Sequence, residues 1–340
     1  MPERAGIKGI IFGAVPLAVA LAIVTAIPAA AQSGSVASLI YAMIPAFIAY
    51  YLTALGHGIF ELSGVLNLAI DGVFTLSVAA SFATAVRLAV AGVNDITAAA
   101  IGILVAGLVG AVLGSLLAFI TTKLPISHGA AGLSLMFVGY GLAPWIGLPA
   151  AYMSQNLLKR KPLLDTNPPT VYTLLAISLL LGVLIYYLIT NTKIGVAIRA
   201  TGENPHAASA LGINVVKTRI MAALIGYTLI GLGGGVFYSL YTQTWQEGAG
   251  MGSGWIAFAI SLSAGRHPIL TMVSAAIFAG ILKHQYLLAS ELNLSRDIAN
   301  MLPFLVALIA MVIFMATPLK RKLAPPSSLG KIFFREERTV

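Results

Sequence analysis

Apolar runs recur along the chain and are separated by short polar segments. A transmembrane helix needs about 20 predominantly apolar residues to cross a hydrocarbon core about 30 Å thick. The runs lie at residues 9–31, 38–56, 71–91, 97–121, 128–149, 171–190, 220–242, 253–264, 269–289 and 298–317. This pattern predicts an all-α polytopic membrane protein with about ten transmembrane helices.

A polar linker at residues 151–170 divides the runs into two sets of five. Because five is odd, the second half must cross in the opposite sense to the first, as in an inverted repeat. We expect a single membrane domain over residues 1–340: a first half at about 8–150, an external linker, a second half at 171–318 and a tail at 319–340. The first run exceeds the roughly 7 to 15 residues of a signal-peptide core, so it is expected to be an uncleaved span.

The third run of each half is irregular. In the first half, residues 64–72, GVLNLAIDG, place Asn67 and Asp71 between glycines. In the second half, the glycine-rich residues 248–254 lead into a run of about a dozen residues, too short to cross as one helix. Matching broken segments in two halves indicate a substrate path. Whether residues 253–264 cross or re-enter stays open, although a crossing keeps the basic C-terminal segment inside.

Residues 192–219 form the longest polar stretch in the middle of the chain. Gly202 can end a first short helix there, and Asn204 followed by Pro205 is typical of the start of a second. Gly212 can close that second helix in the left-handed conformation. A capped helical loop on the water side of a membrane protein indicates a docking surface for a partner.

Composition agrees with a membrane protein, since 59% of residues are hydrophobic, 9% are charged and the mean hydropathy is +0.93. The net charge of +9 comes from residues at the ends of apolar runs, which argues against a nucleic-acid partner. The absence of cysteine excludes disulfides. A cytoplasmic N-terminus places most basic residues, residues 192–219 and the C-terminus inside. The cluster Lys159, Arg160 and Lys161 would be external, as an exception.

Ionisable side chains within a membrane are candidates for function because their burial is costly. Asn67 and Asp71 are four residues apart, so on a helix they would share a face. Asp71 either contacts the solute or caps its own broken helix near residues 72–74. Glu61 is expected in an interfacial ion pair or in solvent.

The chain lacks the motifs of an enzyme. Its histidines show no metal-ligand spacing, and it has neither a phosphate-binding loop nor a catalytic set of side chains. We therefore expect no catalytic residues, metal or cofactor in this chain. Transport energy would then come from an ion gradient or from another subunit.

Three segments together resemble one known family. Residues 195–214, GVAIRATGENPHAASALGIN, resemble the cytoplasmic loop of permease subunits from ABC importers of the branched-chain amino acid, simple sugar and nucleoside group. GVLNLAIDG at 64–72 is similar to another segment of this family, with Asp71 where many relatives carry glutamate. GRHP at 265–268 is similar to the loop after its short eighth segment. The likeness extends from about residue 44 to 317 and favours the nucleoside or simple sugar branch over the amino acid branch.

The resemblance implies a cell-membrane import permease that pairs with a second permease and docks cytoplasmic ATPase subunits, which use ATP and Mg²⁺. An external solute-binding protein would deliver the cargo. The expected ATPase-docking residues of the coupling loop are Gly195, Arg199, Gly202, Glu203, Asn204, Pro205, Ala208 and Gly212. The residues expected on the substrate pathway are Asn67, Asp71, Phe74, Gly252 and Ser253.

Two alternatives remain at this stage. An ion-coupled secondary transporter would use Asp71 as a proton or sodium site. A membrane-embedded enzyme or assembly subunit is disfavoured by the missing catalytic set.

Overall fold

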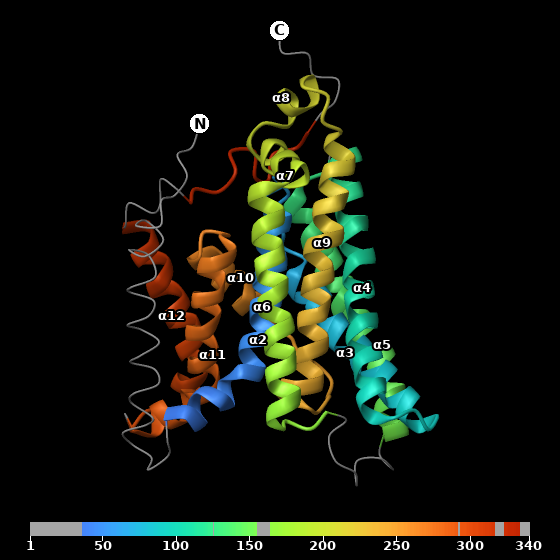
Figure 1. Cartoon of the computed structure of the whole chain (residues 1–340), viewed down its shortest axis with the longest axis vertical. Coiled ribbons are helices and arrows are strands. Elements are labelled where there is room, and N and C mark those ends of the chain that lie inside the picture. Colours follow the sequence, from blue (N-terminus) through green and yellow to red (C-terminus); the bar gives the residue numbers. More distant parts are fainter. Residues whose placement is uncertain (1–35, 125, 155–163, 292, 317–322, 334–340) are drawn as a thin grey trace.

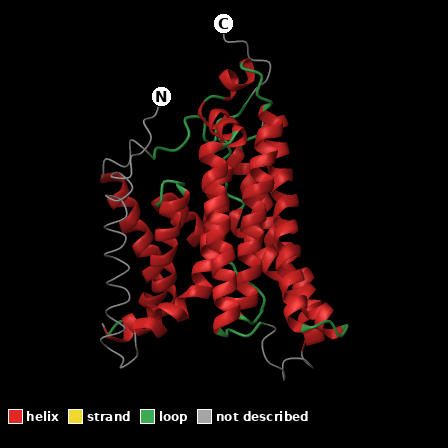
Figure 2. Cartoon of the chain, in the orientation of Figure 1, coloured by secondary structure: helices red, strands yellow, loops and turns green. Residues whose placement is uncertain are grey.

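The computed structural model describes residues 36–124, 126–154, 164–291, 293–316 and 323–333. Within these ranges the regular structure is helical, without a β-strand (Figure 2). The helices are α2 (Val36–Glu61), α3 (Ile70–Val90), α4 (Asp95–Lys123), α5 (His128–Ser154), α6 (Pro168–Asn191), α7 (Lys193–Glu203), α8 (Pro205–Ala210), α9 (Val215–Val236), the π-helix η1 (Phe237–Thr242), α10 (Ser253–Ser263), α11 (Pro268–Glu291) and α12 (Arg296–Ala316).

Among the described residues, seven helical segments are long and apolar enough to span a membrane: α2, α3, α4, α5, α6, α9 with η1, and α11. α10 is apolar but has only 11 residues. The chain is therefore a multi-pass helical membrane protein, as predicted. The expected first span at 9–31 and the cluster Lys159, Arg160 and Lys161 lie outside the described residues.

The centre of the bundle is built where α9 packs against α4 and α2, and where α3 packs against α4 and α5. Glycines allow this close approach. A Cβ atom on Gly226 of α9 would lie 2.5 Å from the carbonyl oxygen of Gly56 on α2. Small residues at helix contacts are typical of membrane bundles. In contrast, α4, α5 and α6 leave large apolar side chains exposed, such as Leu104 and Trp145, which suits a surface facing lipid or another subunit.

Residues 243–266, which contain the broken segment of the second half, extend from one end of the bundle to the other. At its start, the Gln243 side-chain amide donates to the carbonyl of Leu164, shortly before α6 begins. At its finish, Arg266 pairs with Glu61 at the end of α2. Figure 1 shows that this end of the bundle carries α7 and α8. Only α10 is helical between these two points, so residues 253–264 lie in a segment that joins the two ends of the bundle.

Two local predictions were wrong. Asn67 lies in the non-helical residues 65–69, because α3 begins only at Ile70, so Asn67 and Asp71 do not share a helix face. α7 continues through Gly202 to Glu203; Gly202 is buried, and a Cβ atom there would lie 2.1 Å from the carbonyl oxygen of Leu62. The predicted second helix is confirmed: Pro205 is its first residue, and Gly212 follows it with φ +86°.

Candidate functional site

The N-termini of the two broken helices, α3 and α10, meet inside the bundle. A Cβ atom on Gly254 would lie only 2.4 Å from the Cα of Asp71, so nothing larger than glycine fits between the two backbones. The chain reaches this point through Gly248, Gly250 and Gly252, which all have positive φ. Residues 64–72 and 248–254, far apart in sequence, therefore form one junction.

Asp71 holds this junction together. Its Oδ1 accepts the Gly254 N–H at 2.6 Å, and its Oδ2 accepts the Gly252 N–H at 2.9 Å. Oδ2 also accepts a hydrogen bond from the Tyr140 hydroxyl of α5. The first backbone N–H groups of a helix lack internal partners and carry partial positive charge. Asp71 is fully buried and neutralises this charge for α10, whose own N-cap, Gly252, has no side chain to do so.

The carboxylate therefore does cap a broken helix, but not the helix that the sequence suggested. α3 has Ala69 at its N-cap position and receives no side-chain cap there. Asp71 belongs to the first turn of α3, yet it caps α10, which follows about 180 residues later, as the separations of 181 and 183 positions show.

Two hydrogen-bonded pairs of polar side chains lie around the junction. The Tyr50 hydroxyl donates to Oγ of Ser253 at 3.2 Å, and the Tyr227 hydroxyl donates to Oδ1 of Asn67 at 2.6 Å. The side-chain nitrogen of Asn67 is buried without a hydrogen-bond partner among the described residues. Phe74, by contrast, packs edge-to-face against Phe237 at a centroid distance of 5.2 Å and is part of the apolar core.

A buried ion pair lies between this junction and the α7–α8 end of the bundle. Glu61 is fully buried; its Oε2 accepts from Nε of Arg266 at 2.6 Å, and its Oε1 lies 3.4 Å from Nε2 of His57. The Asn67 N–H also donates to Oε1 at 3.3 Å. The expected ion pair of Glu61 is confirmed, and its burial excludes the solvated alternative.

The coupling loop, residues 192–219, is built from local caps. Thr192 accepts the Gly195 N–H at 3.2 Å, Asn204 accepts the Ala207 N–H at 3.0 Å, and Asn214 accepts the Lys217 N–H at 3.0 Å. Each bond joins residues three positions apart, a spacing that is typical of helix N-caps. The loop therefore projects from the bundle as two short, defined helices (Figure 1).

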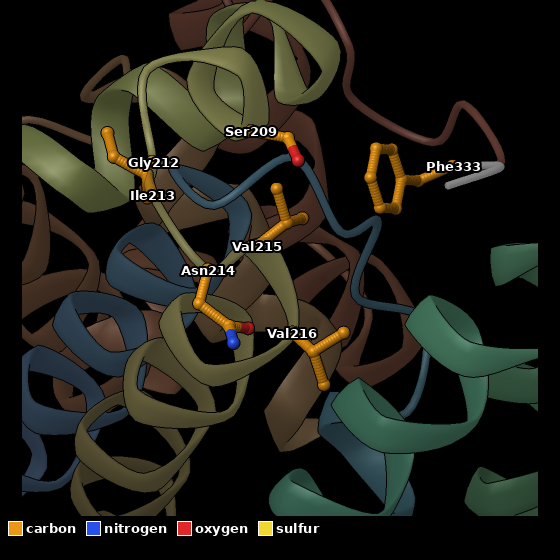
Figure 3. A pocket seen from close by; sticks show the side chains of 7 residues that line it. All are labelled: Ser209, Gly212, Ile213, Asn214, Val215, Val216 and Phe333. Carbon is orange, nitrogen blue, oxygen red and sulfur yellow. The ribbon is translucent and has the colours of Figure 1, made fainter. Parts of the chain in front are cut away.

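The expected docking residues divide into two groups. Gly195, Gly202, Pro205 and Ala208 are buried and shape the loop, whereas Arg199, Glu203, Asn204 and Gly212 are exposed. The sequence analysis missed Leu211, whose exposed fraction of 83% is large for an apolar side chain. Beside it, a shallow pocket of about 200 Å³ lies between the α8–α9 turn and Phe333 (Figure 3). Its lining residues are Ser209, Gly212, Ile213, Asn214, Val215, Val216 and Phe333.

The predicted residues thus lie in two separate places. Asp71, Gly252 and Ser253 meet at the junction, with Asn67 nearby, while the coupling-loop residues lie at the end of the bundle. Tyr140 and Tyr227 were missed because nothing in the sequence near them distinguishes a tyrosine that bonds a remote polar group from one in an apolar core. Arg266 could have been paired with Glu61, since both are charges at the ends of apolar runs.

Comparison with known proteins agrees with this architecture. Residues 39–314 match the family model described as the permease component of the branched-chain amino acid transport system. The chain belongs to this permease family.

Individual relatives are more distant. A guanosine ABC transporter permease protein of Bacillus subtilis, NupQ, is 32% identical over 148 residues, which are 42% of this chain and 46% of the relative. A putative glucose ABC transporter permease protein of Haloferax volcanii, TsgC13, is 25% identical over 197 residues, 53% of this chain and 58% of the relative. A nucleoside ABC transporter permease protein of Lactococcus lactis, NupC, is 25% identical over 150 residues, 43% of this chain and 47% of the relative. The chain spans about half the length of these relatives, and no solved structure matches it.

Proposed function

We propose that this chain is the permease subunit of an ATP-driven ABC importer and that it moves a nucleoside across the cell membrane. The observation that carries the proposal is the family match over residues 39–314, together with a locally capped loop at one end of the bundle. Guanosine and nucleoside permeases among the relatives favour a nucleoside over a sugar, and a sugar over a branched-chain amino acid.

The proposed partners are suggested by a sequence without a nucleotide-binding motif, by the coupling loop and by the exposed apolar flanks. ATP and Mg²⁺ would be used by ATPase subunits docked at the coupling loop, through Arg199, Asn204, Leu211 and Gly212. A second permease subunit would pack on one apolar flank, and a solute-binding protein would deliver cargo on the opposite side of the membrane. Both chain termini would lie in the cytoplasm, on the side of the coupling loop.

The junction is the proposed gate. One non-helical segment enters the bundle from the Glu61 end and the other from the opposite end, which is the arrangement expected of two inverted five-helix halves. Helix N-termini that meet within a membrane form a polar point in an apolar surrounding. Separation of α3 from α10 would uncover Asp71, Ser253 and the backbone N–H groups of α10 to a passing solute.

Contacts link the coupling loop to this gate. A Cβ atom on Gly202 would lie 2.1 Å from the carbonyl oxygen of Leu62, so α7 rests directly on the turn that leads to Asn67. We infer that ATP-dependent displacement of the coupling loop moves this turn and alternates access to the path. The permease itself performs no chemistry.

An ion-coupled transporter is the second candidate, with Asp71 as the ion site. The contacts of Asp71 argue against it, because both carboxylate oxygens already accept hydrogen bonds from α10 and Oδ2 also accepts one from Tyr140. A cation would have to displace the cap of α10.

Co-purification tests the proposal. The tagged chain, extracted from membranes of cells that make the whole transporter, should bring an ATPase subunit with it. Replacement of Glu203, Asn204 and Pro205 by alanine should abolish this association, while Gln246→Ala with Glu247→Ala, two exposed residues of the 243–252 segment, should not. Uptake of tritiated guanosine by the chain alone in liposomes, driven by an ion gradient, would refute the proposal.

A further inference from the structure

The C-terminal segment 323–333, here called the C-terminal strap, lies against two parts of the chain that are distant in sequence. The Ser328 N–H donates to the carbonyl of Gly202 in the coupling loop at 3.0 Å. The Gly330 N–H donates to the carbonyl of Gly64 in the turn after α2 at 3.1 Å. Ser328 and Gly330 are two residues apart. Through them the strap bonds both the coupling loop and the start of the non-helical segment that leads to the junction.

Side chains strengthen the first of these attachments. The Ser327 hydroxyl donates to Oε2 of Glu203 at 2.7 Å, and the Ser327 N–H donates to the same oxygen at 3.3 Å. The Ser328 hydroxyl donates to the carbonyl of Gly202, and Ser328 is buried. Glu203 is exposed, so its carboxylate is held by the strap at the surface of the coupling loop.

The far end of the strap covers a buried cation. Arg219 is fully buried and its Nε donates to the carbonyl of Ser63 at 3.2 Å. Its two terminal nitrogens have no hydrogen-bond partner among the described residues. The Phe333 ring lies over the guanidinium, 5.9 Å from its centre, and also contacts His206 of α8 at a centroid distance of 5.0 Å. Phe333 thus contacts both α8 and Arg219 of α9, and Arg219 in turn bonds the turn at Ser63.

The turn at Gly64, the coupling loop and the strap are packed closely together, with little space to move independently. A Cβ atom on Gly64 would lie 2.7 Å from Oγ of Ser328, 3.2 Å from Cα of Gly202 and 3.4 Å from a terminal nitrogen of Arg219. Gly64 has φ +87°, a conformation that glycine adopts at little cost. The turn, the coupling loop and the strap are therefore in van der Waals contact at one point.

We propose that the C-terminal strap is a positioning element that fastens the coupling loop to the turn at Ser63 and Gly64, so that both move together. The inference rests on the proposed function, because it assumes that an ATPase moves the coupling loop. Displacement of α7 and α8 then reaches the Asn67–Asp71 segment through the strap as well as through the direct contact of Gly202 with Leu62. Without the strap, movement of the docked coupling loop is transmitted less completely to the Asn67–Asp71 segment.

A cross-link tests whether the strap stays attached during transport. The chain has no cysteine, so His206→Cys with Phe333→Cys introduces a unique thiol pair, at two side chains whose ring centroids lie 5.0 Å apart. In membranes that hold the whole transporter, a short bifunctional thiol reagent should join this pair, and uptake of tritiated guanosine should stay within about twofold of the untreated value. Failure to cross-link would overturn the proposed contact. Loss of uptake on cross-linking would show that the strap must release, and would also overturn the proposal.

A backbone variant tests whether the attachment matters. Gly330→Pro removes the N–H that bonds Gly64 and cannot adopt the φ of +77° found there. We expect the ATPase to co-purify and hydrolyse ATP as before, while guanosine uptake falls by about tenfold. Lys331→Ala, which changes an exposed neighbouring side chain, and truncation after Phe333 should each preserve uptake.

The possible outcomes separate this inference from the proposed function. If no ATPase co-purifies with the unmodified chain, the proposed function fails, and the cross-link still reports whether the strap is attached. If Gly330→Pro loses the ATPase, the strap belongs to the docking surface rather than to the transmission path, and the inference fails. Unchanged uptake in Gly330→Pro refutes it directly.

Discussion

The helices of the coupling loop are capped by neighbouring residues, whereas the N-terminus of α10 is capped by a residue that is remote in sequence. Both need acceptors for the unpaired N–H groups at a helix start. In the coupling loop, Thr192, Asn204 and Asn214 cap residues three positions further along the chain. At α10, the acceptor is Asp71, which is 181 positions from Gly252.

The difference indicates what each region can do. A locally capped helix keeps its shape wherever it moves, which suits a loop that transmits the movement of a partner. A helix capped by a remote residue keeps its cap only while two parts of the fold stay together, which suits a gate. The hydrogen bonds of Asp71 would thus change when α3 and α10 separate.

The largest effect is expected at the remote ion pair. Glu61→Ala leaves Arg266 without its partner in the interior, and breaking a buried pair costs about 3 to 5 kcal/mol. Urea or thermal unfolding of the purified protein in detergent should show this loss. Glu247→Ala, at an exposed site, serves as the control and should change stability by less than about 0.5 kcal/mol. A small effect of Glu61→Ala would mean that the remote contacts are weak.

Asp71→Asn is expected to have the next largest effect. Asparagine has nearly the same size, but its NH₂ group replaces one of the oxygens that accept N–H groups from α10, leaving a buried donor without a partner. The expected cost is about 2 kcal/mol, together with reduced guanosine uptake. Tyr140→Phe removes only one donor to the same carboxylate and should cost less, which a parallel unfolding series can measure.

The close approach of α3 and α10 predicts a steric effect. Gly254→Ala would place a methyl group against Asp71 and should destabilise the protein by about 1 to 3 kcal/mol. Gly141→Ala in α5 is the matched control, because its Cβ meets no atom within 4 Å, and the change should be neutral or slightly stabilising. Equal unfolding midpoints for the two variants would contradict the geometry of the junction.

The smallest effect is expected at a local cap. Asn204→Ala removes the side chain that accepts the Ala207 N–H, and the loss of such a cap costs about 1 kcal/mol. Asn204→Asp keeps an acceptor and should retain the stability. Global unfolding should barely respond to Asn204→Ala, since α8 lies outside the bundle; the change should instead appear as faster hydrogen exchange in α8. Protection of α8 equal to that of the unmodified protein would show that the cap is dispensable.

The same comparison explains what the sequence could predict. The spans follow from long apolar runs, and the second helix of the coupling loop follows from Asn204, Pro205 and Gly212, because these signals act within a few residues. The cap of α10 could not be predicted, because the distance from the Asp71 carboxylate to the N–H groups of Gly252 and Gly254 depends on how α3 packs. Likewise, Asn67 looked like a helix-face partner of Asp71, but the bond of its N–H to Glu61 keeps it outside α3. Arg219 was expected to be a cytoplasmic topology signal, yet it lies buried beneath Phe333.

The central claim is that the coupling loop binds the ATPase and the Asp71 junction controls passage. The most direct test measures co-purified ATPase and tritiated guanosine uptake side by side for two variants of the whole transporter. Asp71→Asn should keep the ATPase and lose uptake, whereas replacement of Glu203, Asn204 and Pro205 by alanine should lose both. Loss of the ATPase in Asp71→Asn, or full uptake in either variant, would contradict the account.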